Sequence, residues 1–235
     1  MEHIKRMPTP NVATAYPVVA VPSPTSTTAD ASRVLRNTYA LLAMTLLFSA
    51  AVAAAIAALK LPSPGVLLTL AGYFGLFFVV VRQKNNIWAL PAVFALTGFM
   101  GYTLGPMLSK SLSLPGGAQA VTLALVTTGV TFVALSAWVL KTRREFNFMG
   151  GFLFAGMVIA LVAGLAAMFL QLPALGLVVS AMVALLSVGL ILFETSRIVH
   201  GGETNYVMAT VGLYVSIFNL FTSLLSLSGI GGSDE

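Results

Sequence analysis

Long apolar stretches alternate with short polar connections along the chain, and seven such stretches follow Ser32. A helix needs about 20 predominantly apolar residues to cross the roughly 30 Å hydrocarbon layer of a membrane. The stretches do not show the two-residue alternation that is typical of membrane β-barrel strands. The pattern therefore predicts seven transmembrane helices, at residues 38–59, 65–81, 87–108, 118–140, 148–170, 174–193 and 206–229.

The composition agrees with a membrane location. Hydrophobic residues make up 58% of the chain and charged residues 8%, and the mean hydropathy is +0.96. This is too little polar surface to cover a water-soluble globule. We therefore predict an all-α polytopic membrane protein with one helical domain at residues 32–230. Residues 1–31, rich in proline, are expected to form a disordered N-terminal tail, and residues 231–235 a short C-terminal tail.

The basic residues predict the orientation of these helices. Ten of the 12 Lys and Arg residues lie on one side of the predicted bundle, and only Lys60 and Lys110 lie on the other. Cytoplasmic loops of membrane proteins carry such an excess, so we expect a cytoplasmic N-terminus and, after seven crossings, an extracytoplasmic C-terminus. The net charge of +5 is explained by this topological signal, and we expect no nucleic-acid partner.

The last apolar stretch carries a polar stripe at helical spacing, and we expect its helix to lie at the centre of the bundle, surrounded by helices 1–6. Small and hydrogen-bonding residues suit contacts between helices, where small side chains allow close approach and hydroxyl or amide groups bridge to neighbours. The alternative is a peripheral helix with one packed face. The residues of the stripe are Gly212, Ser216, Asn219, Ser223 and Ser226.

The third stretch contains a second face of small residues. Gly98, Gly101 and Gly105 follow one another at i, i+3 and i+7, a spacing that favours close packing of two membrane helices. Pro106 comes next, and it predicts a break or kink near the outer end of this helix.

Glu194, at the inner end of the sixth stretch, is the acidic residue closest to membrane depth. One interpretation is an ordinary interfacial glutamate with its charge in water. The other is a partly buried carboxylate that senses pH, binds a cation or forms a latch with Arg197, at i+3, or with Arg82. Glu203 lies close to the start of the last helix, where a carboxylate could cap the helix. His200 stands alone and is a poor metal ligand site.

The chain contains no cysteine and shows none of the common catalytic motifs, such as a Ser-His-Asp set, a nucleotide-binding glycine loop or HExxH. We therefore predict no enzymatic activity, no metal and no cofactor.

Four segments resemble the Bax-inhibitor (transmembrane Bax-inhibitor motif) family, and the resemblance covers residues 34–229. Within this family the chain is most similar to the bacterial YccA-type members, inner-membrane modulators of the AAA protease FtsH. The resemblance implies a seven-helix bundle whose last helix is enclosed by the other six, with FtsH and its associated membrane proteins as partners. The segments are LRNTY at 35–39, TGFMGY at 97–102, FLQLP at 169–173 and LFETS at 192–196, which continues into HGGETNY at 200–206.

The resemblance also raises an alternative function. Some family members act as pH-sensitive calcium leak channels that use two acids, one at the end of helix six and one in helix seven. Glu194 corresponds to the first acid, but the second position is Ser216 here, and a shared proton needs two neighbouring carboxylates. Our first hypothesis is thus a non-enzymatic protein that binds FtsH, as a slowly degraded substrate; a cation leak through Glu194 is the alternative. The oligomeric state stays open.

Overall fold

The computed structural model describes the backbone of residues 24–228 and the side chains from Ser32 onward. Within this range all regular structure is helical, and seven helices are long and apolar enough to cross a membrane, as predicted. The helices are α1 (Pro24–Ala58), α2 (Val66–Gln83), α3 (Ala89–Leu112), α4 (Gly117–Thr142), α5 (Gly150–Phe169), α6 (Pro173–Val199) and α7 (Tyr206–Ser228), with a short 3-10 helix at Asn147–Met149 before α5.

The first helix begins earlier than the apolar pattern indicates. It starts at Pro24, inside the segment 1–31 that we expected to form a tail. Proline suits the first position of a helix, because its missing N–H would have no partner inside the helix there. The rest of the predicted tail, residues 1–23, lies outside the described residues, as does the predicted C-terminal tail.

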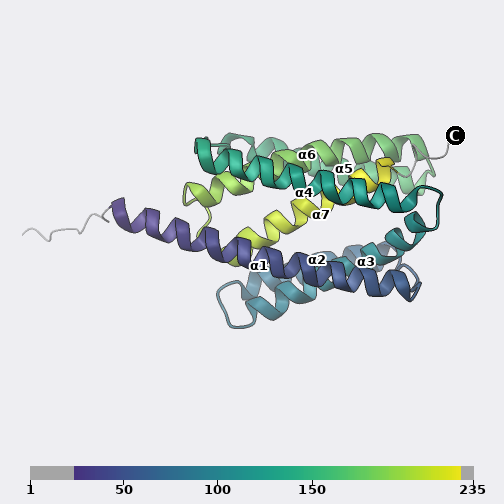
Figure 1. The fold of residues 1–235 in the computed structure, drawn as a ribbon, viewed down its shortest axis with the longest axis horizontal. Helices are drawn as coiled ribbons and strands as arrows, with labels where there is room; N and C mark the ends of the chain where they lie inside the picture. The colour runs from purple at the N-terminus through teal and green to yellow at the C-terminus, as the bar shows by residue number, and fades with distance from the viewer. Residues whose placement is uncertain (1–23, 229–235) are drawn as a thin grey trace, which may run out of the picture.

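The helices form two groups of three with α7 between them (Figure 1). In one group α3 packs against both α1 and α2, and in the other α6 packs against both α4 and α5. The last helix crosses obliquely between the groups, as the yellow ribbon in Figure 1 shows, and its close backbone contacts are with α1, α3, α4 and α6. The prediction that all six helices surround α7 is not confirmed, but α7 holds the two groups together.

Burial along α7 agrees with this position. In α7, 61% of the most apolar window is buried, compared with 44% in α3 and less in each of the other helices described. Every residue from Tyr206 to Ser228 is at least partly buried. This helix therefore has little contact with lipid along most of its length.

The polar stripe of α7 does not bridge to other helices in the way that we expected. The Ser216 hydroxyl donates a 2.8 Å hydrogen bond to the carbonyl oxygen of Gly212, and the Ser226 hydroxyl donates a 2.9 Å bond to that of Thr222. Both bonds stay within the helix. A serine without access to water can satisfy its hydroxyl group on the carbonyl four residues earlier, so it needs no neighbour.

Two residues on other faces of α7 make the bridges instead. The Tyr214 hydroxyl lies 2.6 Å from the Ser49 hydroxyl of α1 and donates a 3.3 Å bond to the carbonyl oxygen of Thr97 in α3. The Thr210 hydroxyl lies 3.3 Å from the carbonyl oxygen of Thr38 in α1. The Tyr214 side chain is fully buried, so this hydroxyl fixes α7 to two helices of one group.

The glycine face of α3 packs against α1. A β-carbon added at Gly101 would lie 2.5 Å from the Ser49 carbonyl oxygen, and one at Gly105 would lie 2.4 Å from the side chain of Ile56. The two backbones can approach only because these side chains are missing. Of the break or kink predicted at Pro106, the break is wrong, because α3 continues to Leu112; the kink stays a prediction. Membrane helices tolerate proline where packing against neighbours holds the helix in place.

Replacing Gly101 by alanine should destabilise the bundle by about 1–3 kcal/mol, because the new methyl group forces α1 and α3 apart. Gly129→Ala is the matched control, since a β-carbon at Gly129 meets no atom within 4 Å. The free energy of unfolding in detergent micelles is the measurement. Equal stability of the two variants would contradict the close α1–α3 contact.

The Tyr214→Phe variant should lower the free energy of unfolding by about 1–3 kcal/mol, because it leaves the buried Ser49 hydroxyl without its partner. Tyr73→Phe is the control, since the Tyr73 hydroxyl makes no hydrogen bond with the residues whose side chains are described. Unfolding of both variants is followed under the same conditions. A loss of stability in Tyr73→Phe as large as that in Tyr214→Phe would refute a specific role for this bridge.

Candidate functional site

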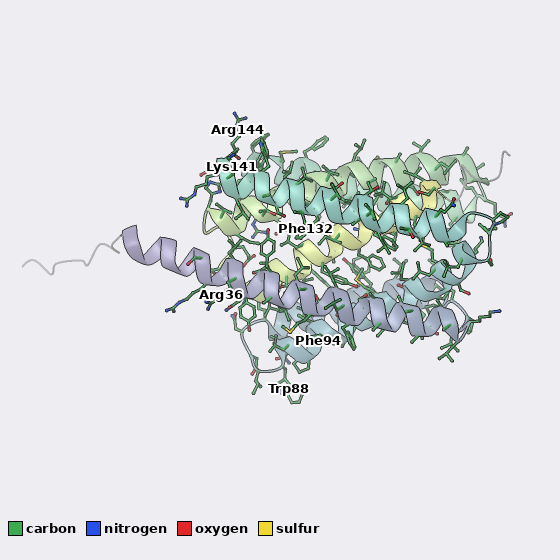
Figure 2. The ribbon with its side chains drawn as sticks, viewed as in Figure 1. Arg36, Trp88, Phe94, Phe132, Lys141 and Arg144 are labelled. Atoms are coloured by element: carbon green, nitrogen blue, oxygen red, sulfur yellow. The ribbon has the colours of Figure 1, made fainter. Side chains whose placement is uncertain are left out.

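Polar and charged side chains gather at the end of the bundle where the α2–α3, α4–α5 and α6–α7 connections lie. Figure 2 shows Arg36, Lys141 and Arg144 projecting from this end. We call it the basic end, and its exposed cations are Arg33, Arg36, Arg82, Lys84, Lys141, Arg143 and Arg144.

Arg197, in the last turn of α6, joins two carboxylates. One guanidinium nitrogen lies 3.6 Å from Glu194, one turn earlier, and the other lies 3.1 Å from Glu203 in the α6–α7 connection. The Glu194 and Glu203 side chains are only 14% and 17% exposed. The guanidinium group also lies 5.5 Å from the centre of the Phe193 ring. Arg197 therefore lies between two largely buried carboxyl groups and fixes the connection to the end of α6.

The Glu194 carboxylate lies directly against α7. A β-carbon added at Gly212 would come within 2.8 Å of the Glu194 carboxyl carbon and 3.0 Å of its nearer oxygen. The first residue of the predicted stripe is therefore a glycine that makes room for this carboxylate.

His200 ties the end of α6 to the α4–α5 connection. Its Nδ1 atom lies 2.9 Å from the Ser196 carbonyl oxygen, and its Nε2 atom lies 2.9 Å from that of Arg143. The Ser196 hydroxyl accepts a 3.0 Å bond from the Phe146 backbone N–H and donates a 3.2 Å bond to the carbonyl oxygen of Arg144. These contacts hold the α4–α5 connection to α6 mainly through backbone groups, so they depend little on the side chains of that connection.

Asn205 caps α7 and joins it to the α2–α3 connection. Its side-chain oxygen accepts bonds of 3.0 and 3.1 Å from the backbone N–H groups of Val207 and Met208. Its side-chain nitrogen donates a 3.0 Å bond to the Lys84 carbonyl oxygen and a 2.8 Å bond to the Asn85 side chain. Sequence analysis missed this residue, although asparagine directly before an apolar stretch is a known signal for a helix start.

The structure brings together some of the predicted site residues and separates others. The Glu194–Arg197 pair is present, whereas Arg82 is exposed and forms no ion pair with Glu194 among the residues whose side chains are described. Glu203 does not cap α7 as we expected. It accepts a 3.0 Å bond from the Asn205 backbone N–H and pairs with Arg197, because the cap position belongs to Asn205.

Together these contacts join all three connections of the basic end. The α6–α7 connection is central, since it contacts α2–α3 through Asn205 and α4–α5 through His200. Within the part of the chain whose side chains are described, no three His, Cys, Asp or Glu side chains are grouped as a metal site. What the arrangement can do is hold the helix ends in fixed positions relative to one another.

The fold and this network define a multi-pass helical membrane protein whose connections at the basic end are joined by hydrogen bonds. The sequence model of the family described as "Inhibitor of apoptosis-promoting Bax1" matches residues 31–233. The chain belongs to this Bax-inhibitor family.

Its relatives include bacterial membrane proteins. The Escherichia coli K12 protein named "Modulator of FtsH protease YccA" is 52% identical over 202 residues, which are 86% of this chain and 92% of that protein. An uncharacterised Pseudomonas aeruginosa protein is 50% identical over 206 residues, 88% of this chain and 93% of its own length. A Vibrio cholerae protein named as a membrane protein is 43% identical over 209 residues, 88% of this chain and 94% of its own.

Asn205→Ala should reduce the free energy of unfolding by about 1–2 kcal/mol, because it removes both the cap of α7 and the link to the α2–α3 connection. Asn205→Ser keeps a cap acceptor but loses the amide donor, so its stability should fall between those of the wild type and the alanine variant. Hydrogen exchange at the start of α7 is the second measurement. Unchanged exchange in the alanine variant would show that Asn205 does not hold this end.

Proposed function

We propose that this protein acts in the bacterial inner membrane as a non-enzymatic modulator of the FtsH protease. The observation that carries the proposal is the 52% identity, over 92% of its length, to the E. coli protein named as a modulator of FtsH. Identity spread over nearly the whole length favours a shared overall activity more strongly than a shared motif would.

The packing suggests how such modulation works. A protease that pulls a membrane protein out of the bilayer must separate its helices, and here α7 lies between the two groups with the Tyr214 hydroxyl bonded to both α1 and α3. Breaking these contacts exposes polar groups to lipid, which costs several kcal/mol for each unsatisfied group. A bundle of this kind is extracted slowly, and a slowly extracted substrate occupies the protease.

The basic end supports a particular orientation of the bundle. Exposed cations favour the cytoplasmic side of a membrane, and the N-terminus of α1 would then lie on that side as well. Residues 1–23, outside the described residues, precede α1 and contain four prolines. We propose that this segment is the handle at which a cytoplasmic ATPase begins to pull.

The site favours this function over a cation leak. A shared-proton switch needs a second carboxylate near Glu194, but Ser216 occupies the related position and its hydroxyl is bonded to the Gly212 carbonyl oxygen. The Glu194 carboxylate faces Gly212 and pairs with Arg197. The Glu194 carboxylate therefore has a packing role between α6 and α7, and this role needs no bound cation.

Deleting residues 1–23 should lengthen the lifetime of the protein in cells with active FtsH, because the protease loses its starting point. Lifetime is measured after synthesis is stopped, in parallel in cells that lack FtsH activity, where the deletion should have no effect. As a matched control, the segment is replaced by a Gly/Ser stretch of equal length, which should restore the lifetime of the wild type. An unchanged lifetime of the deletion variant in active cells would reject the handle, and failure to recover FtsH after cross-linking in native membranes would reject the partner.

A further inference from the structure

The cover of α7 is incomplete between α2 and α5. A groove of about 530 Å³ opens there, with walls formed by α2 and α5 and a floor formed by α7. Its lining is almost entirely apolar. The residues that matter here are Leu70 and Tyr73 of α2, Phe154 and Gly164 of α5, and Asn219 of α7.

Asn219 lies two residues from the middle of α7, so we expect it near the centre of the membrane. It lines this groove and also a smaller cavity of about 190 Å³ between α2, α3 and α7, and Tyr73 lines both as well. Neither the Asn219 amide nor the Tyr73 hydroxyl makes a hydrogen bond with any residue whose side chain is described. A free amide facing hydrocarbon is costly, so this side chain favours an occupant that can bond to it.

On the α5 wall the lining of the groove runs from Phe154 to Leu165. At 1.5 Å per residue this is about 17 Å of helix. A separate cavity of about 350 Å³ lies next to it at the α5–α6 turn and is lined in part by Gly164, Gln171 and Pro173.

The α5 wall suits the close approach of a transmembrane helix. Ala160 and Gly164 lie on it, and small residues let two membrane helices approach closely. An acyl chain would fill the same space but would leave the Asn219 amide without a partner.

We propose that the α2–α5 groove docks a transmembrane helix of another protein that carries an Asn, Gln, Ser or Thr side chain near mid-membrane, and that this side chain bonds to Asn219. The proposal stands apart from the assignment to FtsH, because it specifies the chemistry of the docked helix and leaves its source open. A bridge between polar side chains of two membrane helices contributes modestly, and it should change affinity by roughly 3- to 20-fold.

The test uses the full chain in phosphatidylcholine vesicles and two synthetic transmembrane peptides. Both peptides have about 20 Leu and Ala residues; one carries a central Asn and the other carries Leu at that position. The chain has no cysteine, so Lys60→Cys on the exposed α1–α2 turn accepts a single fluorescent label, and energy transfer from labelled peptide gives the affinity. The Asn peptide should bind roughly 3- to 20-fold more tightly than the Leu peptide.

Two variants locate the binding. Asn219→Leu should abolish the difference between the peptides, whereas Ser226→Ala, which changes a polar residue of the same helix outside the groove, should preserve it. Gly164→Leu should weaken binding of both peptides several-fold by filling the groove. The circular dichroism spectrum and the unfolding transition confirm that each variant is folded. If Asn219→Leu does not fold, Gly164→Leu still tests whether the peptides bind in the groove.

Several outcomes would overturn the proposal. Equal binding of the two peptides to the wild type would exclude the amide contact, and a difference that persists in Asn219→Leu would place the contact elsewhere. Absence of binding by either peptide would exclude a helix as the occupant. Energy transfer between labelled copies of the protein that disappears in Gly164→Leu would assign the groove to a second copy of this chain.

Discussion

Hydrogen bonding without water is the constraint on which this structure depends. In the hydrocarbon layer a polar group must find its partner inside the protein, because lipid offers none. The Tyr214 hydroxyl is the clearest case, since it is fully buried and bonded to groups of both α1 and α3. Its position fixes where α7 lies relative to one group of helices, and the second group then packs against the opposite side of α7.

At the basic end the same constraint acts on charges. Arg197 lies between two largely buried carboxyl groups, and Gly212 leaves the space that the Glu194 carboxylate occupies. Asn205 and His200 extend the network to the other two connections. Polar contacts thus fix the helix ends at the basic end of the bundle. Close packing and a few internal hydrogen bonds fix the middle parts of the helices.

Much of the fold follows from local sequence signals. Seven apolar stretches predicted seven helices, and the spacing of Gly98, Gly101 and Gly105 marked a close-packing face that lies against α1. Of the break or kink expected at Pro106, the break does not occur, because α3 continues beyond this residue while packed against α1. The ion pair of Glu194 and Arg197 could be predicted because both residues lie on one helix at i and i+3. Partners far apart in sequence, such as His200 and Arg143, could not be predicted in this way.

The sequence by itself determined that the chain has seven membrane-spanning helices. Whether a helix can cross the hydrocarbon layer depends on the length of its apolar stretch, which is a local property of the sequence. The sequence also identified a polar stripe on α7. Only the tertiary structure decided which polar side chains of α7 form hydrogen bonds within the helix and which form them with neighbouring helices. A serine can bond to its own helix, whereas a tyrosine hydroxyl reaches beyond it, and the available partner depends on which helices lie alongside.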